Sequence, residues 1–376
     1  MNTAACSLFG IETPIFAFSH CRDVVVEATK AGGLGVLGAS THRPEQLRID
    51  LAWIEARVGG RPYGIDVIMP SADRPNSEGG HRRLDLAILE SIPAGHFEFV
   101  ESLLSEYGIP DLPAEEKERS LREYIESMTF SRVEAERRLE VAFDCPNLRL
   151  VVSALGPAPT HVVDRAHAKG IRIGGMVGNV KHAKVHVAAG ADLIIATGYE
   201  AGGHTGEVTT MVLVPEIAQV IAPVPVLAAG GIGNGQQMAA ALALGAQGVW
   251  CGTIWLGTVE SEASPEVQAK IFASSSADTV RTRCNSGKPA RRLLTAWTEA
   301  WDRADTPEPL PMPLQGILTH LALKRIERAG QSALLTYPAG QVVGQMNEQT
   351  TVRNVFRDML SGYAEAIERL ESTVGA

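Results

Sequence analysis

The chain has 376 residues, of which 45% are hydrophobic and 20% charged, and its formal net charge is -9. Such a composition is typical of a globular protein, and the negative charge argues against nucleic acid or an anionic membrane as a partner, because both select a basic face. The five cysteines form no CxxC pair, which favours reduced thiols over a disulfide framework. The start of the chain has no signal-peptide pattern, and no apolar run reaches the length of a membrane span. We therefore expect a soluble, cytoplasmic protein.

A single pattern recurs along the chain: a helical stretch ends in a small residue and glycine, and a short apolar strand follows. The runs are apolar throughout, as strands buried on both faces must be, and helices separate them. Eight candidate strands begin at Pro14, Leu34, Tyr63, Leu148, Ile171, Asp192, Pro223 and Gly248. Eight such repeats predict an α/β fold of the (β/α)8 TIM-barrel type, and an open doubly wound sheet is the alternative.

Two segments interrupt the repeat. Residues 70–147 are polar and charged with helical spacing, which predicts a helical insertion after strand 3 at the catalytic end. Past about residue 275 the strand pattern stops, and a proline-rich connector precedes two helical stretches. The predicted organisation is therefore a barrel from 1–69 and 148–275, an insertion from 70–147, and a C-terminal helical extension from 276–376 packed on the barrel.

Two glycine-containing strand ends predict a phosphate site. The sequence AAGGIGNG (228–235) follows the seventh strand, and WCGT (250–253) ends the eighth. Glycines let backbone N–H groups approach an anion, and the loops after strands seven and eight form the usual phosphate site of such barrels. A simple tight turn is the alternative, and the spacing does not fit the GxGxxG pattern. We expect a phosphate-bearing cofactor at Gly230, Gly231, Trp250, Cys251, Gly252 and Thr253.

A second glycine-rich loop, EAGGHTG (200–206), directly follows the sixth strand. Gly202 and Gly203 allow a flat ring system to lie against the backbone, and His204 can exchange protons near neutral pH. A lone loop histidine is usually only a solvated side chain. At a barrel strand end and framed by glycines, His204 is instead a candidate catalytic residue. His20, at the end of the first strand, is a weaker candidate.

Three segments together carry a family resemblance: TGYEAGGHTGEVTTM (197–211), PVLAAGGIGNG (225–235) and GVWCGTIWLGTVES (248–261). They resemble the nitronate monooxygenase family, formerly 2-nitropropane dioxygenases, and are equally similar to the flavin-dependent enoyl-ACP reductases. The match covers most of 14–69 and 148–262. It implies an FMN-binding TIM barrel in which Gly202, Gly231 and residues 250–253 line the FMN and its phosphate. His204 matches the active-site histidine of the family.

The sequence also departs from this pattern. Asp66 stands where the family commonly has an amide in the third strand, and Thr197 stands where it commonly has glutamine. The first-strand loop lacks the expected methionine. We place Asp66 and Thr197 at the cofactor, where a carboxylate would disfavour the anionic reduced flavin.

The segment RTRCNSGKPARR (281–292) is a basic cluster in an acidic protein. One interpretation is pairing with the acidic insertion helices. The other is a clamp for a phosphate-rich group such as CoA or NADPH. No ligand pattern for a metal ion is found, and none is expected.

Three functions remain open from the sequence. The first is an FMN-dependent oxidoreductase of the nitronate monooxygenase type, which oxidises a nitroalkane or nitronate with O2. The second is an FMN-dependent NAD(P)H reductase acting on an acyl-CoA or enoyl thioester or on a quinone. The third is a non-enzymatic barrel that senses a phosphate ligand, which nothing in the sequence favours. The first two predict a small-molecule substrate.

Overall fold

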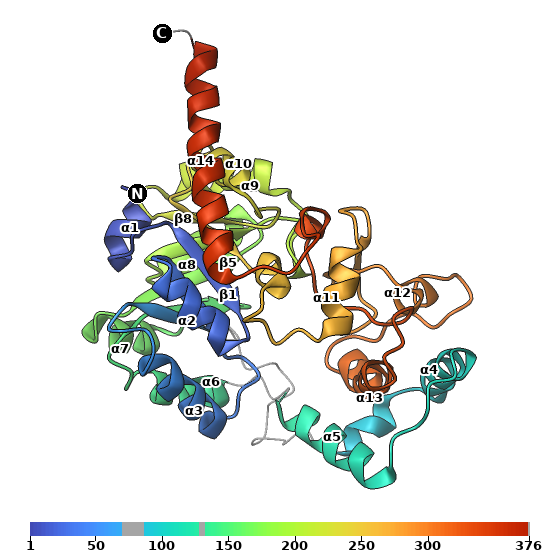
Figure 1. The fold of residues 1–376 in the computed structure, drawn as a ribbon. Coiled ribbons are helices and arrows are strands. Elements are labelled where there is room, and N and C mark those ends of the chain that lie inside the picture. The colour runs from blue at the N-terminus through green and yellow to red at the C-terminus, as the bar shows by residue number, and fades with distance from the viewer. Residues whose placement is uncertain (70–85, 128–131, 375–376) are drawn as a thin grey trace.

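The computed structural model describes residues 1–69, 86–127 and 132–374. Part of the predicted insertion, residues 70–85 and 128–131, lies outside the described residues. Eight parallel strands close into a barrel in chain order (Figure 1). They are β1 (Ile15–Ser19), β2 (Leu34–Gly38), β3 (Tyr63–Ile68), β4 (Leu148–Ala154), β5 (Arg172–Val177), β6 (Leu193–Thr197), β8 (Val226–Ala229) and β9 (Gly248–Cys251). The predicted TIM barrel is confirmed, and the open-sheet alternative is wrong.

The barrel interior is a packed apolar core, as expected of strands that are buried on both faces. Inward-facing side chains from the strands fill it, and the short helix α1 (Ala4–Phe9) adds its apolar side to the same cluster. Phe9 of α1 meets Phe16 of β1 edge to face, with ring centroids 5.5 Å apart. The interior therefore offers no channel, and a ligand of the barrel has to lie at a mouth.

A ring of helices covers the outside of the barrel and buries a second, larger apolar layer. The ring consists of α2 (Arg22–Lys30), α3 (Pro44–Glu55), α6 (Arg132–Ala142), α7 (Thr160–Ala168), α8 (Val180–Ala188), α9 (Thr210–Ile221) and α10 (Gly235–Ala243). Although α6 belongs to the 70–147 segment, it packs beside α3 and β3. Its Ala135, Leu139 and Ala142 join the barrel core, so the last part of that segment serves as a barrel helix.

The final helix, α14 (Val352–Val374), runs along α10 and α2 and extends past the barrel (Figure 1). Gly235 permits this packing, because a Cβ there would lie 2.1 Å from the backbone nitrogen of Tyr363. A side chain at this position would push α14 away from the barrel.

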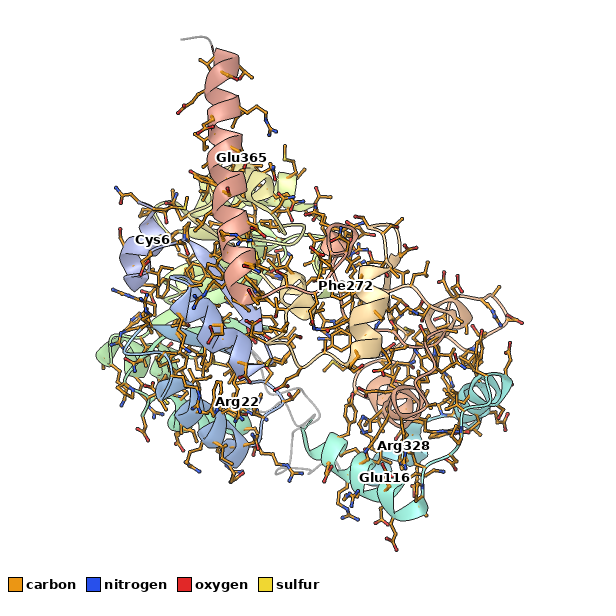
Figure 2. The ribbon with its side chains drawn as sticks, viewed as in Figure 1. Cys6, Arg22, Glu116, Phe272, Arg328 and Glu365 are labelled. Atoms are coloured by element: carbon orange, nitrogen blue, oxygen red, sulfur yellow. The ribbon has the colours of Figure 1, made fainter. Side chains whose placement is uncertain are left out.

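A separate apolar core joins the insertion to the C-terminal half of the chain. Its helices are η2 (Leu86–Ser91), α4 (Ala94–Glu106), α5 (Ala114–Ser127), α11 (Pro265–Phe272), α12 (Ala296–Ala300), α13 (Leu314–Arg328) and η4 (Gln341–Gln345). Arg325 contacts Glu101 at 2.7 Å, and Arg328 contacts Glu116 at 2.6 Å, where the two side chains face each other (Figure 2). These helices gather on one side of the molecule, away from α3 and α7 (Figure 1).

A small antiparallel sheet contains β10 (Thr279–Thr282), β11 (Ala290–Leu293) and β7 (Gly203–His204), in that order. The prediction that strands stop past residue 275 is therefore wrong. The two later strands carry arginine and threonine and pair with a loop far away in the sequence, so they lack the apolar signature of a barrel strand. Within the described residues, no helix is both long and apolar enough to cross a membrane.

Candidate active site at the barrel mouth

Two polar side chains in the C-terminal halves of barrel strands each have a buried oxygen without a hydrogen-bond partner in the described residues. Asp66 of β3 is 6% exposed, and Thr197 of β6 is 8% exposed. Asp66 Oδ2 and Thr197 Oγ1 make no hydrogen bond with the described residues. A buried polar atom left unsatisfied costs about 1–3 kcal/mol. Because Thr197 ends β6 and Asp66 lies in the second half of β3, both are near the C-terminal mouth of the barrel, which is the edge where a ligand can supply the missing partners.

Burial raises the pKa of Asp66 from its ordinary value of 3.8 to about 7, although a hydrogen bond from Ser40 opposes the shift. The carboxyl is therefore partly protonated at neutral pH. A protonated carboxyl both donates and accepts, as an amide does. This chemistry fits the sequence comparison, in which Asp66 stands where an amide is common.

We expect Asp66→Asn to remove a pH dependence of stability in the flavin-free protein. Between about pH 4 and pH 7 the folded state keeps a proton that the unfolded state has lost, so stability falls as the pH rises through this window. The total is on the order of 4 kcal/mol for a shift of this size. Melting temperatures at pH 5 and pH 8 should differ clearly less in Asp66→Asn than in the native chain. The exposed Asp305→Asn serves as control, and an unchanged pH slope in Asp66→Asn would contradict the assignment.

Aromatic side chains form the floor between these strand ends. Phe18 of β1 stacks on Trp250 of β9 with ring centroids 5.7 Å apart. His20 lies at the exposed rim, where its Nδ1 is 3.0 Å from the Gly38 carbonyl oxygen. A Cβ on Gly38 would lie 2.6 Å from that nitrogen, so glycine is required for His20 to occupy this position.

The glycine turn after β8 is built by left-handed backbone. Gly230 has φ 95° and Gly231 has φ 72°. A Cβ on Gly230 would lie 3.0 Å from the Gly198 carbonyl oxygen, so the turn lies close against the loop after β6. The N–H groups of Gly231 and Ile232 make no hydrogen bond with the described residues. Unpaired amides in a left-handed turn form an anion-binding concavity.

The strand end after β9 meets the C-terminal segment. Thr253 Oγ1 accepts a hydrogen bond from the Gly340 N–H at 2.9 Å, at the start of η3 (Thr253–Gly257). Gly340 also lies against Gly202, where a Cβ would approach its nitrogen to 2.8 Å. Cys251 instead packs in the outer layer between barrel and helices. Burial raises its pKa to about 12. Thus Trp250, Gly202 and Thr253 surround the mouth, whereas the Cys251 side chain points away from it.

Glu200 and Thr210, to which the sequence analysis gave no role, connect the two glycine loops. The Glu200 carboxylate accepts from the Thr210 N–H at 3.0 Å and from its hydroxyl at 2.9 Å. The same hydroxyl is 2.8 Å from the Gly230 carbonyl oxygen. Glu200 thereby ties the start of α9 to both glycine loops. The joint occurrence of EAGGH and TTM in the sequence was the available signal.

His204 sits on β7 opposite Ala290 of β11. Its Nδ1 is 3.1 Å from the Pro289 carbonyl oxygen, a contact that directs Nε2 away from this backbone. Although His204 is exposed at the sheet edge, partial removal from water lowers its pKa. The positive charges of Lys288 and Arg292 lower it further, against the raising effect of the Pro289 carbonyl. His204 is therefore neutral at pH 7 and able to accept a proton at Nε2.

In the described residues, Arg281 of the basic cluster pairs with Glu207 at 3.7 Å and Arg283 donates to backbone carbonyl oxygens, so pairing of the cluster with the insertion helices stays a prediction. Acids of those helices pair with α13. Arg291 donates to the Tyr199 carbonyl oxygen at 3.1 Å and to Thr279 Oγ1 at 3.1 Å. Its guanidinium lies 4.5 Å from the centre of the Tyr199 ring. Arg291 therefore holds the small sheet against the loop that carries His204.

A cleft of about 300 Å³ lies behind the Gly230–Gly231 turn, between α9 and α10. Its lining includes the Glu200 carboxylate, Met211 and Gln345. Gly231 and Ile232 of the turn line this cleft as well, and the Glu200 carboxylate disfavours an anion on this side of the turn. Among the residues that the structure describes, no group of three or more metal-ligating side chains comes together.

Comparison with known proteins connects this geometry to a family. The family model described as nitronate monooxygenase matches residues 6–362. The chain is 47% identical to "Putative monooxygenase Rv1533" of Mycobacterium tuberculosis, over 100% of both chains. It is 27% identical to a "Probable nitronate monooxygenase" of Staphylococcus saprophyticus, over 95% of this chain and 97% of the relative. The crystal structure of nitroalkane oxidase from Streptomyces ansochromogenes has the same fold, with a TM-score of 0.76 at 24% identity, covering 98% of this chain and 100% of the other.

Proposed function

The chain belongs to the nitronate monooxygenase family, and we propose that it is an FMN enzyme that oxidises a nitroalkane or its nitronate with O2. The family makes it a flavin-dependent oxidoreductase. The observation that carries the proposed reaction is His204, whose Nδ1 lies 3.1 Å from the Pro289 carbonyl oxygen so that Nε2 is left to act as a base. Removal from water and the charges of Lys288 and Arg292 lower its pKa. Positive charges near a base stabilise the anion that forms when a carbon acid loses its proton, and a nitroalkane is such a carbon acid.

The residues at the mouth fit a flavin mononucleotide. The N–H groups of Gly231 and Ile232 and the Thr253 hydroxyl would hold the phosphate. The unpartnered atoms of Asp66 and Thr197 would meet the polar edge of the ring above Phe18 and Trp250. When bound, the flavin supplies the two-electron chemistry of the reaction.

The chain's own residues would act on the substrate. His204 Nε2 takes the proton from the carbon next to the nitro group, while the hydrogen bond to Pro289 keeps the ring oriented. The positive charges of Lys288 and Arg292 stabilise the negative charge that develops on the nitro oxygens. Gly203, with φ 74° and open space at its Cβ position, leaves room for the substrate beside the histidine.

Purified protein is expected to be yellow and to release FMN, not FAD, on denaturation. The reason is one compact anion site at Gly231 and Ile232, with no dinucleotide-binding fingerprint in the sequence. Chromatography of the released flavin against FMN and FAD standards makes the distinction. A colourless preparation that also fails to bind added FMN would overturn the cofactor assignment.

The runner-up function is an FMN-dependent NAD(P)H reductase of an acyl thioester or a quinone. It is favoured by Arg281 and Arg291, since Arg281 Nε and an Arg291 Nη are buried without partners and could meet a phosphate. Anaerobic stopped-flow mixing separates the two functions. Rapid bleaching of the flavin by NADH or NADPH favours the reductase, and bleaching by a nitronate alone favours the oxidase.

A further inference from the structure

Arg292 of β11 is a buried cation without a counter-ion among the described residues. Its exposed fraction is 7%, and its Nε has no hydrogen-bond partner. Among the residues that the structure describes, the neighbour whose charge favours its protonated form is Cys284, which burial keeps as a neutral thiol. Burying a charge is expensive unless it is paired. Arg292 thus differs from Arg325, which the structure pairs with Glu101 at 2.7 Å.

The register of the small sheet places Arg292 on the same face as His204. His204 lies opposite Ala290, and Gly203 lies opposite Arg291. Side chains alternate along a strand, so Ala290 and Arg292 share the face of His204, while Arg291 points to the other face. The charge of Arg292 reaches the imidazole, because it is one of the causes that lower the pKa of His204.

We propose that Arg292 binds a planar anionic oxygen pair of the substrate, a carboxylate or a nitronate, beside His204. This inference rests on the proposed function and narrows its substrate class to organic anions. A guanidinium fork matches two coplanar oxygens and forms charge-assisted hydrogen bonds with them. The substrate would then supply the counter-ion that the described chain lacks.

Anion binding at Arg292 also affects the base. In the free protein the positive charges of Lys288 and Arg292 disfavour a proton on His204. An anion against Arg292 cancels part of this field and makes protonation of His204 easier. For a nitroalkane that carries a carboxylate, the base therefore gains proton affinity when substrate is bound and a proton has to be accepted; a nitronate has already lost that proton.

Calorimetric titration with butyrate, and with butyramide as the neutral analogue, tests the site without requiring turnover. The native protein should bind butyrate and not butyramide. Arg292→Gln should weaken butyrate binding by about 10-fold to 100-fold, the usual effect of losing a charge-assisted pair. Arg292→Lys keeps the positive charge but not the planar guanidinium, so its butyrate affinity should lie between those of the native protein and Arg292→Gln. Arg283→Gln removes the same charge from an exposed site and is the matched control, expected to bind like the native protein.

Kinetics with propyl-1-nitronate identify which anion Arg292 holds. If the nitronate itself is held, Arg292→Gln raises its KM; if a carboxylate is held, only butyrate binding suffers. Equal butyrate affinity and equal nitronate KM in Arg292→Gln and the native protein would overturn the inference. Folding of the variant is checked by its melting temperature, which should not fall, because an unpaired buried charge has been removed. If no nitronate reduces the flavin the proposed function fails, while the butyrate titration still decides the role of Arg292.

Discussion

Replacing His204 with alanine is expected to leave the flavin bound and to lower turnover per bound flavin by about 100-fold to 10,000-fold, the usual contribution of a positioned general base. The residues proposed to hold the phosphate, Gly231 and Thr253, lie on other strand ends and do not contact the imidazole. Steady-state assays with a neutral nitroalkane, normalised to flavin absorbance, measure the effect, because its nitronate has already lost the proton that the base would remove. His161→Ala, an exposed histidine on α7, is the control for losing a surface imidazole and should keep full activity.

A second substitution separates proton transfer from hydrogen bonding. His204→Asn should lose nearly as much turnover as His204→Ala if the imidazole accepts a proton, and should recover much of it if a hydrogen bond suffices. A purely structural role predicts that both variants lose stability and flavin together, with turnover per bound flavin preserved. Near-native turnover in His204→Ala would remove this residue from the mechanism and direct attention to His20, which lies at the rim on the Gly38 carbonyl.

The eight barrel strands could be predicted from the sequence because burial on both faces imposes uninterrupted apolar runs, several of them preceded by a glycine that ends a helix. The hairpin of β10 and β11 could not. Its inward side chains include Arg291, which is stabilised by the Tyr199 ring and by hydrogen bonds to Tyr199 and Thr279. The burial of this arginine depends on contacts with a loop about 90 residues away in the sequence. The alternation of polar and apolar residues within the strand therefore does not predict it.

In the candidate site, too, some features could be predicted from the sequence and others could not. The glycine loops were predictable because left-handed backbone at Gly230 and Gly231 restricts residue choice. Asp66 was recognised as a departure, but its raised pKa follows from burial, which the sequence does not give. Arg292 was visible only as one member of a basic run. The register of β11 against β7 is what separates it from Arg291 and places it on the face of His204.

Gly231→Asp is expected to abolish flavin retention while the barrel remains folded. The new carboxylate would enter on the Glu200 side of the turn, beside the unpaired N–H groups, and it would repel a phosphate bound to those groups. Loss of such charge-assisted contacts together with repulsion is on the order of 2–5 kcal/mol, enough to empty the site during gel filtration.

Part of any effect comes from the backbone, because Gly231 has φ 72° and a Cβ at this position would lie 3.3 Å from Glu200 Cβ. Two controls isolate this part. Gly231→Ala adds the same Cβ without charge and should bind FMN more weakly than the native protein but more tightly than Gly231→Asp. Gly59→Asp places an aspartate at φ 61° in open space far from the mouth and should remain fully loaded. Stoichiometric FMN in Gly231→Asp would show that the phosphate lies elsewhere.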